Sequence, residues 1–180
     1  QTPLQRAVAA LAKMKARLDV LERAATETIA VIGMGGRFPA GGDGPAAFWD
    51  ALARGADGVH EIPPERWPHE AVPHAPPGTR WAGLIDHFDG FDASFFGIAP
   101  REAESMDPQQ RLTLEVVWEA LEDAGIRPST LEGSRTGVFV GVTSLDYREL
   151  MRDHRTGTFD AYCTTGNLIA TTAGRVSYVL

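Results

Sequence analysis

The sequence contains one cysteine, Cys163, among its 180 residues. A lone cysteine excludes a disulfide within the chain and a zinc site built from cysteines, and it is typical of a reducing compartment. Long apolar runs are missing as well. No stretch reaches the roughly 18 residues that a membrane span requires, and the N-terminus has no apolar signal-peptide core. We therefore expect a cytoplasmic protein without a membrane partner.

Cations are in deficit, because 17 Lys and Arg face 24 Asp and Glu for a formal net charge of −7. Phosphate binding needs a surplus of cations, so this balance predicts no nucleic-acid partner. Hydrophobic residues make up 43% of the chain, which is ordinary for a globular protein and argues against disorder. The length predicts one domain with an appendage.

An apolar heptad repeat occupies residues 3–25 and predicts a helix with a narrow apolar stripe. Arg17 falls at a g position and Glu22 at the following e position, which pair across chains in a parallel two-stranded coil. We predict a coiled-coil or docking helix within residues 1–27 that pairs with a second copy, and the alternative is an amphipathic helix packed on its own domain. The a and d positions are Leu4, Ala7, Leu11, Met14, Leu18, Leu21 and Ala25.

Residues 28–180 are predicted to form the second unit. Apolar runs at 29–32 and 137–142 predict short buried strands, and the glycines of 33–36 predict a tight turn. Three further segments are expected: a helix over 46–54, a proline-rich loop over 57–82 fixed by Trp67 and Trp81, and a buried helix over 166–180.

The best-defined helix is predicted to begin after Asp107, a favourable N-cap residue, with Pro108 at its first position. Gln110 is expected to complete a capping box with Asp107, and Gly125 is expected to end the helix. The predicted apolar face consists of Leu112, Val116, Val117, Leu121 and Ala124.

The glycines near residue 33 partly match the glycine-rich turn of dinucleotide-binding proteins, but the residues that follow argue against that function. Gly33 and Gly35 match its first two glycines, but Phe38 stands at the third and Pro39 interrupts the helix that should follow. A structural role for the glycines is therefore favoured.

Other reactive residues form no complete catalytic or metal-binding set. No lysine, arginine or histidine adjoins Cys163 in sequence, which predicts a buried, unreactive thiol. The aspartates of residues 86–92 lack the spacing of a calcium loop, and the histidines lack the i,i+4 spacing of a metal-binding helix. We expect no metal in this chain.

Several strings in fixed order resemble the ketosynthase (beta-ketoacyl synthase) domain of modular type I polyketide synthases. The resemblance covers residues 29–180, and the helix at 3–25 resembles the short coil that precedes such domains. The matching strings are Ile-Ala-Val-Ile-Gly-Met-Gly-Gly-Arg-Phe-Pro-Ala-Gly-Gly at 29–42, Phe-Phe-Gly-Ile-Ala-Pro-Arg-Glu-Ala at 95–103, Met-Asp-Pro-Gln-Gln-Arg-Leu at 106–112, Trp-Glu-Ala-Leu-Glu-Asp-Ala-Gly-Ile at 118–126, Gly-Val-Phe-Val-Gly at 137–141, Asp-Tyr at 146–147, Thr-Gly-Asn at 165–167 and Ala-Gly-Arg-Val-Ser-Tyr at 173–178.

The resemblance implies the N-terminal portion of a thiolase-like layered α/β fold in a homodimer. Such enzymes condense an acyl thioester with a malonyl-type extender on acyl carrier protein, whose phosphopantetheine carries the substrate, and this chain itself is expected to bind no cofactor. The family's nucleophilic cysteine and two histidines are expected beyond Leu180, and Cys163 does not occupy the nucleophile's place. We therefore expect no catalytic residue in this chain and no activity from it alone.

The same resemblance places Thr165, Gly166, Asn167 and Leu168 near the dimer interface, where they help to line the acyl tunnel, and a pure packing role is the alternative for each. Upstream and downstream polyketide synthase modules or domains are further expected partners. Two alternatives for the function stay open: a dimerisation or docking segment without catalysis, and a non-condensing relative that decarboxylates or sets chain length. A nucleotide-binding oxidoreductase is disfavoured by Phe38 and Pro39.

Overall fold

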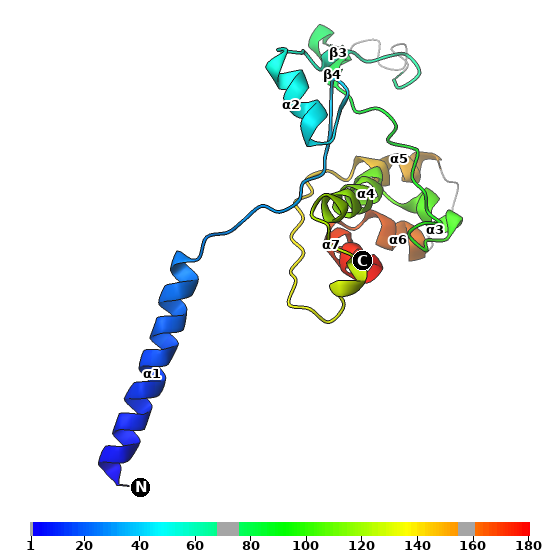
Figure 1. The fold of residues 1–180 in the computed structure, drawn as a ribbon. Coiled ribbons are helices and arrows are strands. Elements are labelled where there is room, and N and C mark those ends of the chain that lie inside the picture. Colours follow the sequence, from blue (N-terminus) through cyan, green and yellow to red (C-terminus); the bar gives the residue numbers. More distant parts are fainter. Residues whose placement is uncertain (1, 68–75, 155–160) are drawn as a thin grey trace. The chain divides into compact units, whose positions relative to one another are not determined.

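The structure, a computed structural model, describes residues 2–67, 76–154 and 161–180 (Figure 1). It divides into two compact units, Gln1–Val31 and Ile32–Leu180. Within the described residues, no helix combines the length and the apolar character of a membrane span.

The first unit contains one long helix, α1 (Pro3–Thr26), where the heptad repeat predicts it. Thr2 caps the helix reciprocally with Gln5: the Gln5 amide donates to the Thr2 hydroxyl at 3.3 Å, and the Thr2 amide donates to the Gln5 side chain at 2.9 Å. This capping box satisfies two amides that a helix start leaves unpaired. The large apolar side chains of the stripe are 55–74% exposed, and they are Leu4, Leu11, Met14, Leu18 and Leu21.

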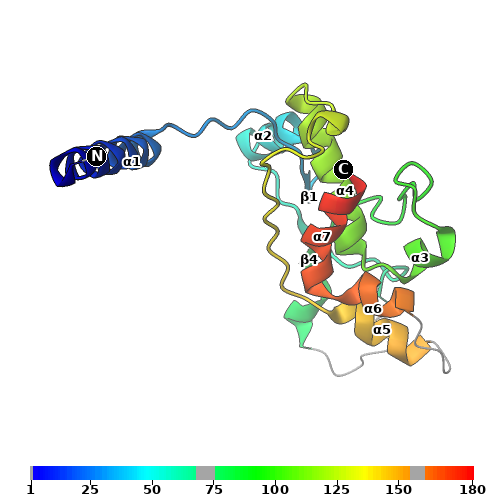
Figure 2. The same ribbon diagram turned by 90° about the horizontal axis from the view of Figure 1, so that it is seen from below.

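The second unit is rich in helices, and short antiparallel strands pair beside them (Figures 1 and 2). Its helices are α2 (Pro45–Ala53), α3 (Pro100–Ser105), α4 (Pro108–Asp123), α5 (Asp146–His154), α6 (Ala161–Asn167) and α7 (Ile169–Val179), with short 3₁₀ turns η2 (Pro77–Arg80) and η3 (Pro128–Thr130). Strand β1 (Arg37–Phe38) pairs with β2 (Gly42–Asp43), and β3 (Val59–Glu61) pairs with β4 (Trp81–Gly83).

The core of the second unit lies where α3, α4 and α7 meet. Met106 and Leu114 are fully buried there, and Ile98, Ala103 and Val176 complete the buried cluster. Burial of one side chain of this size contributes about 1.5–3 kcal/mol. The core therefore joins segments that are far apart in the sequence, and it fixes the start of α4 against α7.

The two predicted buried strands are not strands in the structure. Residues 29–32 and 137–142 are extended, but neither pairs with another strand in the described ranges. Ile29 and Phe139 are each 96% exposed, whereas Val138 packs against the core cluster. An extended segment becomes a strand only when a neighbour satisfies its backbone groups, and no described residue does so here.

The predicted tight turn at 33–36 is also wrong, because this segment runs extended along α4. A Cβ at Gly35 would lie 2.6 Å from the Val116 carbonyl oxygen, and a Cβ at Gly33 would collide with the Ala120 carbonyl oxygen. The Met34 amide donates to the Asp123 carboxylate at 2.9 Å. The glycines therefore permit close backbone approach to the helix, which no other residue allows.

The predicted loop at 57–82 is partly wrong, because β3, η2 and β4 lie within or at the end of it. The described prolines of this stretch lie outside the paired residues, so they do not interrupt the ladder. They are Pro63, Pro64, Pro76 and Pro77. Trp67 is half-buried, as expected of an anchor, but Trp81 is 56% exposed and does not pin the segment. Residues 68–75 lie outside the described residues.

The predicted helices are present with altered limits. The helix expected over 46–54 is α2, which ends before Gly55 at a φ of +62°, and Phe48 of this helix stacks on Phe38 with ring centroids 3.9 Å apart. The helix expected over 166–180 is α7 with the end of α6, since the extended backbone of Leu168 separates the two.

Candidate site at the junction of helices α4, α6 and α7

The start of α4 is fixed by Asp107, which is 6% exposed. Its carboxylate accepts from the Gln109 amide at 2.8 Å, as the predicted N-cap should. Its own amide donates to the Gly166 carbonyl oxygen at 2.9 Å. The cap therefore also ties α4 to α6.

Gln110 does not complete the predicted capping box. Its side chain, 3% exposed, turns away from Asp107 toward the break between α6 and α7. Its Nε2 donates to the carbonyl oxygens of Thr165 and Leu168, each at 3.3 Å, and to the Thr171 hydroxyl at 3.1 Å. A capping box would pair only the side-chain oxygen of Gln110, and the Asp107 amide that it needs already donates to Gly166. The observed position pairs both ends of the buried side-chain amide.

The other end of the Gln110 amide is held by Arg175 of α7. Arg175 Nε donates to Gln110 Oε1 at 3.0 Å, and Arg175 Nη1 forms a 2.6 Å ion pair with Glu102 Oε1 of α3. The two ion-pair side chains are only 12% and 22% exposed. Glu102, Arg175 and Gln110 therefore form one partly buried polar network across α3, α7 and α4.

The structure brings the four predicted site residues together at the α6–α7 break, with two different environments. Gly166 and Asn167 are buried, whereas Thr165 and Leu168 are exposed. A Cβ at Gly166 would lie 2.6 Å from the Ser105 carbonyl oxygen. Gly166 is therefore engaged in close packing, and of the four only Thr165 and Leu168 present side chains outward.

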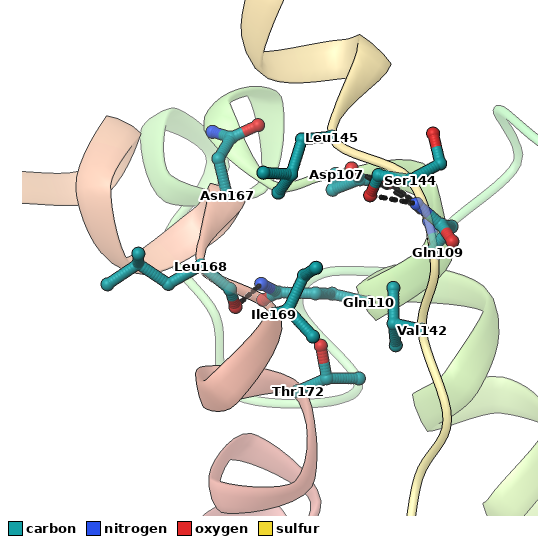
Figure 3. Close-up of a pocket in the computed structure, with 10 residues that line it drawn as sticks. All are labelled: Asp107, Gln109, Gln110, Val142, Ser144, Leu145, Asn167, Leu168, Ile169 and Thr172. Atoms are coloured by element: carbon teal, nitrogen blue, oxygen red, sulfur yellow. Dashed lines mark hydrogen bonds between the residues drawn. The ribbon is translucent and has the colours of Figure 1, made fainter.

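Asn167 lines a small cavity beside the start of α4 (Figure 3). Its Nδ2 donates to the carbonyl oxygens of Ser105 and Cys163, both at 2.8 Å. The cavity has a volume of about 10 Å³, and its polar lining includes Asp107, Ser144 and Thr172. A space of this size suits a single water molecule, and it is partly open to solvent.

The junction offers positioning rather than reactive groups. Cys163 is 7% exposed, so the predicted burial of its thiol is confirmed. Within the described ranges, no group of three or more His, Cys, Asp or Glu side chains could hold a metal ion. His69 and His74 lie outside the described residues.

A second polar cluster lies on α4, facing the segment that carries the glycines. Arg37 donates to both carboxylate oxygens of Glu119, at 2.6 Å through Nη1, and this hydrogen bond is the main cause that raises the pKa of Arg37. Desolvation by burial raises the pKa of the neighbouring Glu115, and the charges of Arg37 and Arg111 oppose that rise.

The sequence profile described as the beta-ketoacyl synthase N-terminal domain matches residues 26–180. The chain belongs to this family. It is 46% identical over 193 aligned residues to a phenolphthiocerol/phthiocerol polyketide synthase subunit of Mycobacterium tuberculosis, covering 99% of this chain and 9% of that protein. It is 48% identical over 184 aligned residues to the phenolphthiocerol synthesis polyketide synthase type I Pks15/1 of Mycobacterium bovis, covering 98% of this chain and 8% of that protein. The chain thus spans less than a tenth of these relatives.

Solved structures confirm the predicted fold class. The ketosynthase domain OzmH KS7 of oxazolomycin synthesis from Streptomyces albus JA3453 superimposes with a TM-score of 0.69 at 36% identity, over 85% of this chain and 28% of that one. The ketosynthase of module 6 of the bacillaene synthase from Bacillus subtilis 168 gives 0.71 at 33% identity, over 85% and 24%. The chain is therefore the N-terminal part of a ketosynthase domain with the thiolase-like α/β fold.

Sequence reasoning missed the role of Gln110 and Arg175. The partners of each residue lie more than fifty positions away from it along the chain, so no local pattern reports these contacts. The sequence offered one signal, the polar side chain of Gln110 near a helix start. We interpreted that side chain as part of a capping box with Asp107, which is wrong.

Proposed function

We propose that this chain is part of a ketosynthase that extends polyketide chains by decarboxylative Claisen condensation. In that reaction the malonyl-type extender on acyl carrier protein loses CO₂, and its α-carbon forms a bond to the carbonyl carbon of the acyl group. The cysteine thiolate that carried the acyl group leaves. The observation that carries the proposal is the family match over residues 26–180, together with relatives that are polyketide synthase subunits.

In this proposal the chain supplies structure, and the nucleophilic cysteine and two histidines lie beyond Leu180. Cys163 is a poor candidate for the nucleophile because it is 7% exposed and lies inside α6. A nucleophile must be reached by the acyl thioester, and reactive cysteines are partly exposed. The extender reaches the site on the phosphopantetheine of acyl carrier protein, so acyl carrier protein and neighbouring polyketide synthase modules or domains are the proposed partners in the cytoplasm.

We further propose that Thr165 and Leu168 contribute to the wall of the acyl tunnel at the dimer interface. Both are exposed on the chain, and the Leu168 side chain is 42% exposed. The buried Gln110 amide fixes the backbone carbonyls of both residues. Gly166 and Asn167 then act indirectly, by packing this segment against Ser105.

The test is acylation of the full-length protein and of the 180-residue chain with an acyl thioester, followed by peptide mass spectrometry. We expect a stoichiometric adduct on a cysteine outside this chain in the full-length protein, and none on the isolated chain. An adduct on Cys163 in either protein would contradict the assignment of the nucleophile. Absence of any acyl adduct on the full-length protein, with no condensation product, would contradict the condensing function and favour a non-condensing relative.

A second proposal concerns α1, which we infer pairs with α1 of a second copy as a parallel coiled coil. The specific support is the exposed stripe that runs the length of the helix. An exposed apolar seam at heptad spacing is stabilised by a partner helix. In the parallel arrangement Arg17 faces Glu22 of the second copy, whereas an antiparallel pair centred on the helix places Lys15 opposite another Lys15.

Sedimentation velocity on the full-length protein tests this pairing. Leu11→Lys places a charge in the seam, and Ala9→Lys places the same charge on the opposite side of α1 as the matched control. We expect Leu11→Lys to weaken dimerisation and Ala9→Lys to leave it unchanged. Equal dimerisation in all three proteins would show that α1 does not drive association.

A further inference from the structure

The side-chain amide of Asn167 has one end paired and the other unpaired. Nδ2 faces the Ser105 and Cys163 carbonyl oxygens. This fixes the orientation of the amide, because an oxygen at that place would face two acceptors. Oδ1 therefore points away from both carbonyls. No donor in the described part of the chain reaches it, although Asn167 is only 3% exposed.

A buried acceptor without a donor is costly, because folding has removed the water that paired it in the unfolded chain. The large majority of buried polar side-chain atoms in native proteins are paired with protein or with ordered water. We therefore expect Oδ1 of Asn167 to accept a hydrogen bond from a donor that the described part of the chain does not contain. The groups around Oδ1 indicate the kind of donor.

The space in front of Oδ1 is the small cavity of Figure 3. The amide oxygen of Asn167 is turned toward Leu145, on the side of the cavity where Asp107 and Ser144 also lie, and the amide nitrogen is turned away from Leu145. The volume of about 10 Å³ admits one water molecule. Leu145 and Ile169 contribute apolar surface, and the other lining residues include the polar side chains of Asp107, Ser144 and Thr172.

The polar groups around the cavity match the needs of a water molecule. A buried water makes about three hydrogen bonds and needs both acceptors and donors around it. The Asn167 amide oxygen and the Asp107 carboxylate are acceptors, and the hydroxyls of Ser144 and Thr172 can donate or accept.

We propose that this cavity is a binding site for a single water molecule, which donates a hydrogen bond to Asn167 Oδ1. Its remaining hydrogen bonds go to the polar groups of the wall. The water then links the α6–α7 break to the start of α4 and to residues 142–145. This proposal concerns how the chain holds its own segments together, and it does not rest on the proposed function.

A high-resolution crystal structure of the full-length protein tests the proposal directly. We expect one density peak roughly 2.6–3.2 Å from Asn167 Oδ1, with at least one further contact to Asp107, Ser144 or Thr172. A dry cavity would overturn the proposal. So would a protein donor at Oδ1, whether from another part of the polypeptide or from a second copy.

A pair of matched variants gives a second measurement. Val142→Ile adds one methyl group to a residue that lines the cavity, and Val140→Ile adds the same group at a residue that lines a larger groove beside Val138 and Val176. If water fills the cavity, Val142→Ile displaces it, leaves Oδ1 unpaired and lowers the Tm below that of Val140→Ile. If the cavity is dry, the added methyl group fills it, and a Tm equal to or above that of the control contradicts the proposal.

Discussion

Arg175 Nε donates to the Gln110 side-chain oxygen at 3.0 Å, and this bond holds together two helices whose residues are 65 positions apart. Gln110 uses the other end of its amide to hold the backbone of Thr165 and Leu168. One uncharged side chain thus couples the ion pair of Arg175 and Glu102 to the α6–α7 break. Low local dielectric strengthens such a network when every member is paired, and penalises it when one member is removed.

Gln110→Met should lower the free energy of unfolding by about 1–3 kcal/mol, because Arg175 Nε then lacks its acceptor in a buried place. In this variant the Thr171 hydroxyl still lies 2.6 Å from the Thr165 and Leu168 carbonyl oxygens and can donate to them, which limits the loss of stability. Denaturant unfolding of the ketosynthase domain measures the effect. Gln109→Met is the matched comparison, since its side-chain bonds are longer than 3.1 Å and only half-buried. An equal or larger loss in Gln109→Met would contradict the assigned role of Gln110.

Gly35→Ala should be destabilising, because its Cβ would meet the Val116 carbonyl oxygen at 2.6 Å and α4 would have to move away. We expect a loss of more than about 1 kcal/mol, which is typical of strain at a closely packed position. Gly174→Ala is the control: Gly174 lies in α7 with nothing within 4 Å of an added Cβ. Alanine there should stabilise the helix by about 0.5–1 kcal/mol. A Tm that shifts in the same direction in both variants would contradict this prediction.

Glu115 should make stability depend on pH. Desolvation by burial raises its folded-state pKa above the ordinary value of 4.5, so the folded state binds more protons than the unfolded state in the interval between the two values. Stability therefore falls as the pH rises through that interval. Glu115→Gln should remove this part of the pH dependence, and it should be slightly more stable than the parent at pH 7 but not at pH 4.

The control for this effect is Glu122→Gln, which changes an exposed carboxylate on the same helix. Urea unfolding at several pH values gives the comparison. A greater loss of stability at pH 7 than at pH 4 in Glu115→Gln would mean that attraction to Arg37 and Arg111, rather than desolvation, dominates at this position.

The isolated 180-residue chain should self-associate. Phe139 and Tyr178 are 96% and 91% exposed, and Phe139 lies in an extended segment with no strand partner among the described residues. Unpaired extended backbone with apolar side chains favours association. Light scattering should show less association for Phe139→Ser than for the parent chain, with Thr143→Ser in the same stretch as control. A monodisperse monomer that melts sharply would disprove the expectation.

Elements with local signals could be predicted from the sequence. Asp107 caps α4 because an aspartate before Pro108 satisfies amides at a helix start, whatever lies elsewhere in the chain. The heptad spacing likewise predicts α1 to within a residue or two, and the order of the strings identifies the family.

Features that depend on distant segments could not be predicted. The apolar run at 137–142 predicts extended backbone correctly, but pairing requires a neighbour that the local pattern cannot supply. Gly35 was expected to make a turn, because glycines cluster around it. Its actual role is to let the backbone pass close to Val116, which is far along the chain and leaves no local signal. Two of the four candidate site residues, Gly166 and Asn167, proved to be buried for the same reason: their partner is Ser105.

The contact between Gly166 and the Ser105 carbonyl restricts how this surface can be redesigned. Position 166 accepts no side chain, and its own carbonyl is committed to the Asp107 amide. A combinatorial library that aims to change what this segment touches should therefore randomise Thr165 and Leu168 and keep Gly166 and Asn167 constant. Diversity introduced at the two buried positions would mainly yield misfolded clones.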